Sequence, residues 1–222
     1  MTNQQSATKW TYGDSWERYP IEEGQRWQAG TGAVAVHNLF TPLPAFVKKA
    51  DALFIDPPWN LGNINSFYTK ARRTDYLYEY STFVTRLFAC IVQIAPQVCY
   101  LEMGDQFATD YKMRLNTVAG FRCVECWPVT YYKKHPCWIL RGGATPYAGT
   151  DLTGMDEATC IEMIAREEQY ECIGDLCMGR GLVGLAAFKA GRAFVGTELN
   201  KRRLAVLLAT IAKAGGEVRR VS

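Results

Sequence analysis

The sequence predicts an α/β fold in which a mostly parallel sheet lies between two layers of helices, a three-layer αβα arrangement. Strand-like runs alternate with segments of helical periodicity along the chain, which is the pattern of βαβ units. One apolar run, Leu53–Ile55, ends abruptly in Asp-Pro-Pro-Trp, and another, Cys172–Leu176, leads directly into a glycine-rich turn. Sheets of this class bind ligands at the carboxyl ends of their strands, so both endings are candidate functional sites.

Composition places the chain among globular proteins. Its 222 residues suffice for one large domain, and a hydrophobic content of 48% can supply a packed core. No apolar run approaches a membrane span, and the polar amino terminus lacks the apolar core of a secretory signal. The eight cysteines are scattered through apolar segments, so we expect reduced core residues and a cytoplasmic protein. A net charge of +3 is only weakly basic, so any nucleic-acid surface must come from local patches.

The elements follow in a regular order after an amino-terminal segment without clear periodicity. Residues 1–32 are interpreted as an N-terminal arm, either packed on the domain or partly disordered, and residues 33–222 as a single domain. The first strand–helix–strand unit comprises Ala33–Val36, Leu43–Lys49 and the strand before Asp56. Further strands are expected at Gln97–Met103, Phe121–Tyr132, Cys172–Leu176 and Ala193–Thr197, and further helices from Tyr76 to Ile91, Asp105 to Ala119, Thr153 or Asp156 to Glu168, Leu182 to Ala190 and Asn200 to Lys213.

Two basic segments, residues 61–74 and 133–150, are predicted to be loops near the carboxyl edge of the sheet. Both contain glycine with polar or proline turn formers, and loops of this length inside a compact domain are usually functional. Lysine and arginine side chains in such loops position nucleic acid through its phosphates. The candidates for this role are Arg72, Arg73, Lys133, Lys134 and Arg141, although each one singly fits a solvated surface charge.

The Asp-Pro-Pro-Trp ending suits chemistry on a planar amine. Pro57 and Pro58 cannot continue the strand, because proline has no backbone N–H and a fixed φ. The exocyclic amine of adenine or cytosine is a weak nucleophile, since its lone pair is delocalised into the ring. Acceptors at the Asp56 carboxylate and the Pro57 carbonyl would draw that nitrogen toward tetrahedral geometry, and Trp59 offers a face for base stacking. Taken alone, the four residues fit equally well a strand that merely ends at a turn.

The second ending is a nucleotide-binding pattern. Gly179, Gly181 and Gly184 form a G-x-G-x-x-G turn between a strand and a helix, and Glu198 ends the next strand about 20 residues later. An acid in that place can accept hydrogen bonds from a ribose diol. The pattern fits NAD and equally the adenosine half of S-adenosylmethionine. Only S-adenosylmethionine explains the glycine turn and the Asp-Pro-Pro-Trp segment by one reaction. A methyl donor bound at the first and an amine bound at the second, held in line, would react as one bound pair.

These residues resemble the amino-group DNA methyltransferases, which methylate adenine N6 or cytosine N4. Asp56–Asn60 (DPPWN) is similar to the family's catalytic motif, and Gly174–Asn200 to its cofactor segment, in the permuted order of the β-type branch. The resemblance implies a Rossmann-like methyltransferase fold, S-adenosylmethionine as cofactor, and catalytic roles for Asp56, Pro57, Pro58 and Trp59. The cofactor residues that it implies are Asn38, Leu39, Asp56, Asp175, Leu176, Cys177, Met178, Gly179, Gly181, Glu198, Leu199 and Asn200.

The chain departs from the family's pattern within the cofactor segment. Cys177 replaces an aromatic residue that packs on the cofactor, and Leu182 and Val183 replace paired threonines. The chain also has no segment large enough for a separate target-recognition domain, which implies a short recognition sequence, relaxed specificity or help from a second subunit in a homodimer. No metal site is expected, because Cys123 and Cys126 form a single C-x-x-C without a second pair at zinc spacing.

The leading hypothesis is an S-adenosylmethionine-dependent adenine-N6 methyltransferase that acts on a flipped base in duplex DNA or on a single strand. Cytosine-N4 methylation and RNA adenosine-N6 methylation are alternatives of the same class. A non-catalytic nucleic-acid-binding subunit with this fold is an alternative of another class, and a nicotinamide-dependent dehydrogenase is a more distant one.

Overall fold

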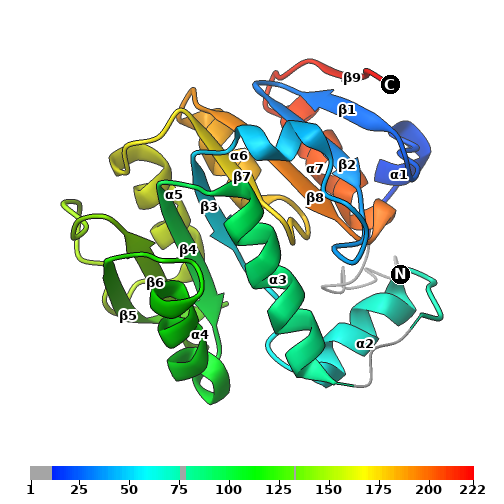
Figure 1. Cartoon of the computed structure of the whole chain (residues 1–222). Coiled ribbons are helices and arrows are strands. Elements are labelled where there is room, and N and C mark those ends of the chain that lie inside the picture. Colours follow the sequence, from blue (N-terminus) through cyan, green and yellow to red (C-terminus); the bar gives the residue numbers. More distant parts are fainter. Residues whose placement is uncertain (1–11, 76–78, 133) are drawn as a thin grey trace, which may run out of the picture.

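A computed structural model describes residues 12–75, 79–132 and 134–222, and within them the strands form one nine-stranded sheet (Figure 1). The strands are β1 (Arg26–Ala29), β2 (Gly32–Val36), β3 (Ala52–Ile55), β4 (Val98–Met103), β5 (Cys123–Tyr131), β6 (His135–Gly143), β7 (Cys172–Asp175), β8 (Ala193–Glu198) and β9 (Val218–Arg220). The helices are α1 (Ser15–Arg18), the 3₁₀-helix η1 (Ala45–Lys49), α2 (Leu61–Lys70), α3 (Tyr80–Ile94), α4 (Asp105–Thr117), α5 (Glu157–Glu167), α6 (Leu182–Lys189) and α7 (Lys201–Lys213).

The centre of the sheet is parallel and its two margins are antiparallel. The strand order is β5-β6-β4-β3-β7-β8-β2-β1-β9, and the five strands from β4 to β2 run in one direction. The β5–β6 hairpin closes one margin, and β1 with β9 closes the other. The mostly parallel sheet expected from the sequence is therefore confirmed.

Side chains of the central strands alternate between two hydrophobic clusters, one on each face of the sheet. Ala52 and Phe54 of β3 pack with residues of α5, α6 and α7, whereas Leu53 and Ile55 pack with residues of η1, α2, α3 and α4. Figure 1 shows these two groups of helices on opposite faces. A strand buried on both faces reads as a continuous apolar run, which is why β3 could be recognised in the sequence. The three-layer αβα arrangement is confirmed.

The prediction of a loop at residues 61–74 was wrong, because residues 61–70 form helix α2. Asn60 caps this helix: its φ of −161° is extended, and its side chain accepts a hydrogen bond from the N–H of Asn63 at 2.9 Å. Ile64 and Tyr68, four residues apart, are both buried. Glycine and asparagine in the first turn concealed this short apolar stripe in the sequence.

The prediction of a loop at residues 133–150 was also wrong for residues 135–143, which form strand β6. Strand β6 pairs with β5 along its whole length, from His135 opposite Tyr131 to Gly143 opposite Cys123. Basic residues, a proline and two glycines weakened the strand signal in the sequence, and only the segment after Gly143 is irregular.

The amino-terminal segment contributes to the same sheet within the described residues. Strand β1 pairs antiparallel with β2, and the side chains of Ile21 and Trp27 are buried in the core. Residues 1–11, like Tyr76 and Lys133, lie outside the described part of the chain. Among the described helices, none combines the length and apolar character that crossing a membrane requires.

Candidate active site

The two sequence motifs meet where the sheet changes its winding direction. Strands β3 and β7 are parallel neighbours, with Ala52 opposite Ile173. After β3 the chain continues to β4 on one side, whereas after β7 it continues to β8 on the other. Ligands of open α/β sheets bind at the carboxyl ends of strands at such a switch point. Asp56 follows β3 and Asp175 ends β7, so the two motifs, far apart in the sequence, lie at one edge of the sheet.

Hydrogen bonds and ring contacts hold the Asp-Pro-Pro-Trp segment in place. Trp59 Nε1 donates to Asp56 Oδ1 at 3.1 Å, so the indole orients the carboxyl group. The Trp59 ring packs against Gly104 after β4, where an added Cβ would stand 2.7 Å from Trp59 Cε3. Tyr80 donates to the carbonyl of Pro58 at 2.8 Å, and Tyr131 places its ring centroid 5.2 Å from that of Trp59. The tryptophan therefore positions the acid in addition to offering a ring, a contact that the sequence alone did not predict.

The half-buried Asp56 carboxyl has an unusual acidity. Burial is the largest cause, and the carboxylate of Glu157 on α5 adds to it, so that the pKa of Asp56 rises to about 7. The hydrogen bond from Trp59 and the positive charge of Arg203 act in the opposite direction. A carboxyl that titrates near neutral pH in a functional position is typical of active sites.

A second carboxyl, Glu102, lies beside Asp56 and was missed by the sequence analysis. Ile55 is paired with Leu101 of β4, so the next residues, Asp56 and Glu102, are neighbours and face the same side of the sheet. Glu102 is 1% exposed and accepts a hydrogen bond from the Cys137 thiol at 3.7 Å. Burial, followed by the charge of Asp56, raises the pKa of Glu102 well above its usual value. The sequence did contain a signal for Glu102, because it is the single acid in the otherwise apolar strand Val98–Met103.

The glycine turn is fastened to Glu198 through the backbone. Gly179 and Gly181 have φ of 54° and 78°, which side-chain-bearing residues rarely adopt. Gly179 N donates to Glu198 Oε2 at 2.6 Å, and Asn200 N donates to Oε1 at 2.8 Å. Each carboxylate oxygen of Glu198 retains a further acceptor position, so the side chain can still accept hydrogen bonds from the hydroxyls of a ribose. The Asp175 carboxyl similarly accepts from Cys177 N at 2.9 Å, and burial raises the pKa of Asp175 well above its usual value.

The other predicted cofactor residues mostly build the frame of this edge. Asn38 accepts a hydrogen bond from the Tyr68 hydroxyl at 3.1 Å, and Asn200 caps α7 while donating to the carbonyl of Lys70 at 3.2 Å. Both asparagines thus tie α2 to the carboxyl ends of β2 and β8. Leu39, Leu176 and Met178 are buried, and Cys177 and Leu199 pack against the core from partly buried positions.

Arg203, in the first turn of α7, is a positive charge at this edge that the sequence analysis missed. Its guanidinium carbon lies 5.1 Å from the Phe67 ring centroid of α2. A Cβ added at Gly179 would stand 3.1 Å from Arg203 Nη2, so the guanidinium lies over the glycine turn. Its charge lowers the pKa values of both Asp56 and Asp175, although burial outweighs it.

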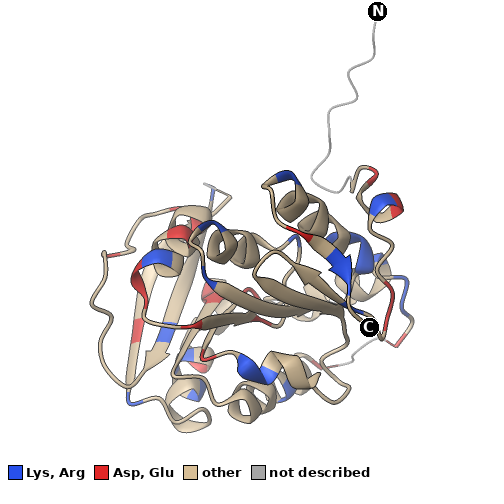
Figure 2. Cartoon of the chain, turned by 90° about the horizontal axis from the view of Figure 1, so that it is seen from above, with Lys and Arg blue, Asp and Glu red and all other residues tan. Residues whose placement is uncertain are grey.

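The residues predicted to contact nucleic acid lie in different environments. Arg72 and Lys134 are exposed, at the end of α2 and in the β5–β6 turn, whereas Lys133 lies outside the described residues. Arg73 forms ion pairs with Glu23 and Asp75. Figure 2 shows lysine and arginine positions interspersed with aspartate and glutamate over the molecule.

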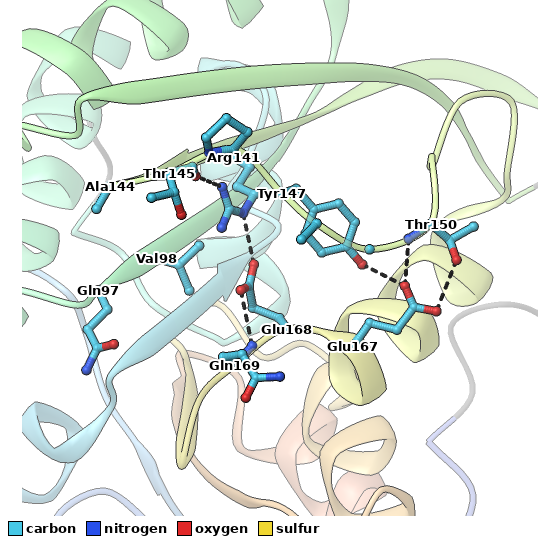
Figure 3. Close-up of a pocket in the computed structure, with 13 residues that line it drawn as sticks. Gln97, Val98, Arg141, Ala144, Thr145, Tyr147, Thr150, Glu167, Glu168 and Gln169 are labelled. Carbon is cyan, nitrogen blue, oxygen red and sulfur yellow. Dashed lines mark hydrogen bonds and ion pairs between the residues drawn. The ribbon is translucent and has the colours of Figure 1, made fainter.

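Arg141 was wrongly predicted to contact phosphate. Arg141 is 5% exposed, and its guanidinium forms an ion pair with Glu168 at 2.9 Å (Figure 3). A second ion pair joins it to Glu125 at 3.1 Å. Arg141 lines a cavity of about 780 Å³ with Val98, which begins β4, so this cavity lies at the opposite edge of the sheet from Asp56. Glu167 at the rim is already bound by Thr150 and Tyr147. Among the described residues, no group of three or more His, Cys, Asp and Glu side chains is arranged to hold a metal ion.

Comparisons with known proteins identify the fold. No family model matches the sequence, and no curated protein matches it. Among solved structures, M1.HpyAVI in complex with SAM is 15% identical with a TM-score of 0.54 and covers 80% of this chain and 98% of its own. TTHA0409 from Thermus thermophilus, assigned as a DNA modification methylase and complexed with S-adenosyl-L-methionine, is 14% identical with a TM-score of 0.58, covering 81% and 94%. PvuII DNA methyltransferase, cytosine-N4-specific, is 10% identical with a TM-score of 0.57, covering 88% and 98%. This chain is thus an α/β protein with the fold of these methyltransferases.

Proposed function

We propose that the chain is an S-adenosylmethionine-dependent DNA methyltransferase that modifies an exocyclic amine, most readily adenine N6. The observation that carries the proposal is the position of Asp56 and the Gly179 turn at the carboxyl ends of two adjacent parallel strands. Either motif alone fits several functions. Together they supply an acceptor for an amine and a turn suited to a nucleotide-like ligand, at one edge of one sheet.

The residues at this edge fit such a cofactor. S-adenosylmethionine combines an adenosine, a positively charged sulfonium, an ammonium and a carboxylate. The carboxyl groups of Asp175 and Glu198 favour the cationic groups and the ribose hydroxyls, and Gly179 adds no side chain to the turn. When bound, the cofactor supplies an electrophilic methyl group.

Asp56 and its neighbours would then activate the amine. The Asp56 carboxylate and the Pro57 carbonyl accept the amine's two N–H bonds, which pulls the nitrogen toward tetrahedral geometry and makes its lone pair available. Trp59 fixes the carboxyl through its N–H, and Tyr80 fixes Pro58, so the acceptors are oriented before the base arrives. After transfer, the charged nitrogen loses a proton to Asp56 or to water.

Nucleic acid would approach along the exposed cations near this edge. Arg72, Lys134 and, by sequence, Lys133 are the remaining candidates for phosphate contacts. A base in duplex DNA must be flipped out at a cost of a few kcal/mol, and a single strand avoids most of that cost. With so small a recognition surface, a short or relaxed target sequence is proposed, and a homodimer would extend the surface.

Transfer of labelled methyl groups tests the proposal. The protein is incubated with methyl-labelled S-adenosylmethionine and either DNA or RNA, and the product nucleosides are separated. We expect label in N6-methyladenine from DNA and a loss on the order of 100-fold or more in Asp56→Ala, with cofactor affinity retained. Glu162→Ala, an exposed carboxylate on α5, serves as the control. Near-normal transfer by Asp56→Ala contradicts the mechanism.

The same experiment separates the alternatives. Label in N4-methylcytosine would favour the reaction named for PvuII DNA methyltransferase, whose fold this chain shares. Label in RNA alone would favour an RNA adenosine methyltransferase. The replacement of the usual aromatic residue by Cys177 motivates the non-catalytic alternative, and absence of cofactor binding in a calorimetric titration would support it.

A further inference from the structure

The Arg203 guanidinium is half-buried, and its charge acts on the buried acids Asp56 and Asp175. Within the described part of the chain it donates no hydrogen bond and forms no ion pair, and it lies against the ring of Phe67. An arginine held against an aromatic ring is oriented and partly desolvated. Such a group is suited to binding an anion that comes from outside the chain.

The position of this charge points to the glycine turn. Arg203 Nη2 lies 3.1 Å from where a Cβ of Gly179 would stand, so any side chain at residue 179 would crowd the guanidinium. Glu198 is bound to the same turn through Gly179 N, and its carboxylate does not pair with Arg203. The cation and the acids therefore occupy separate places around one turn.

The first turn of helix α6 carries no polar side chain, so a side-chain donor for an anionic ligand would have to lie outside this helix. Leu182 and Val183 have neither hydroxyl nor charge, so their side chains cannot bind a carboxylate. The amino-acid end of S-adenosylmethionine is a zwitterion, with an ammonium and a carboxylate on one carbon. Asp175 and Glu198 can bind the positively charged groups of this ligand. Its carboxylate requires a hydrogen-bond donor from another residue.

We propose that Arg203 binds the carboxylate of the cofactor's methionine moiety. This inference rests on the proposed function. Arg203 lies between the glycine turn and α2, on the cofactor's side of the site, whereas the β5–β6 turn with Lys134 lies beyond Trp59 and Tyr131. A guanidinium–carboxylate pair would fix the methionine chain and so the direction in which the methyl group points.

Two ligands that differ at the amino-acid end test the inference. S-adenosylhomocysteine carries the carboxylate, and 5′-methylthioadenosine has the same adenosine and sulfur without it. Affinities of both are measured by calorimetry for the wild type, Arg203→Gln and Arg203→Lys, with Arg202→Gln as the adjacent control. We expect Arg203→Gln to lower the affinity for S-adenosylhomocysteine about 10- to 100-fold and the affinity for 5′-methylthioadenosine less than about twofold. Arg203→Lys should retain part of the affinity, and Arg202→Gln should change neither.

Each other outcome overturns the inference in a recognisable way. An equal loss of affinity for both ligands would show that Arg203 only maintains the shape of the site. Unchanged affinities would show that Arg203 takes no part in cofactor binding. Unchanged cofactor affinity with a higher KM for DNA would assign it to a phosphate. If the wild type binds neither ligand, the proposed function fails together with the inference; if it binds both and the ratio is unaffected, only the role of Arg203 fails.

Discussion

Asp56 is subject to opposing influences from residues on different elements. Burial and the Glu157 carboxylate favour its neutral form, whereas the Trp59 N–H and the charge of Arg203 favour its ionised form. The balance leaves its pKa at about 7. The Asp-Pro-Pro-Trp motif identified Asp56 and Trp59 from the sequence, because the two residues lie close together in the chain. Glu157 and Arg203 reach the same place from helices that follow it by more than a hundred positions, so no local pattern could reveal them.

The pH dependence of transfer follows from this balance. The ionised Asp56 carboxylate is the stronger acceptor for the amine's N–H and the form that can take up a proton after transfer, and its pKa in the folded protein is raised above the ordinary value. Activity should therefore be low below the raised pKa, rise with pH through about 7 and then level off in kcat/KM for DNA. Glu157→Gln removes a neighbouring negative charge, so its rise should occur at lower pH, whereas Glu162→Gln, exposed on the same helix, should not shift it. A profile unchanged by Glu157→Gln would contradict this assignment.

Helix α5 shows how an element's boundary places a functional side chain. Asp156 caps it by accepting hydrogen bonds from Thr159 N at 3.4 Å and from the Thr159 hydroxyl at 2.9 Å. Glu157 is the next residue, so the cap determines where that carboxylate stands relative to Asp56. The cap was predictable, because aspartate before an apolar periodic segment is a frequent start signal.

Removal of this cap should weaken the fold by a predictable amount. Asp156→Ala leaves an N–H of the first turn without its acceptor, and we expect the free energy of unfolding to fall by about 1 kcal/mol. Asp156→Asn retains an acceptor and should stay within a few tenths of a kcal/mol of the wild type. Urea denaturation followed by circular dichroism measures both. Equal losses in the two variants would show that charge, not capping, is the cause.

The elements that sequence patterns did not reveal share a physical reason. Helix α2 has only two buried positions, and β6 carries a proline, two glycines and a buried arginine that is stable only because Glu168 and Glu125 neutralise it. Strand β9 has only three residues, Val218–Arg220, which are too few to show a period in the sequence. In each case a tertiary partner decides the structure, and that partner is distant in sequence.

At the scale of the whole molecule, the parallel centre of the sheet brings the two motifs together. Strand β3 lies between β4 and β7, so the end of the first motif's strand neighbours the end of the second motif's strand in space. This adjacency could be predicted, because both motifs follow buried strands and ligand sites of such sheets gather at switch points. The positions of α2 and of the β5–β6 hairpin around the site could not, since they depend on packing between elements.

The measurement that tests the central claim most directly is the affinity of a bisubstrate compound, in which adenine N6 is joined covalently to the sulfur end of an S-adenosylhomocysteine analogue. If the Asp56 segment and the Gly179 turn form one site, the compound should bind on the order of 100-fold more tightly than S-adenosylhomocysteine alone. Asp56→Ala should remove most of that gain while leaving the affinity for S-adenosylhomocysteine unchanged. An affinity no higher than that of S-adenosylhomocysteine, in a wild-type protein that binds the latter, would contradict the account.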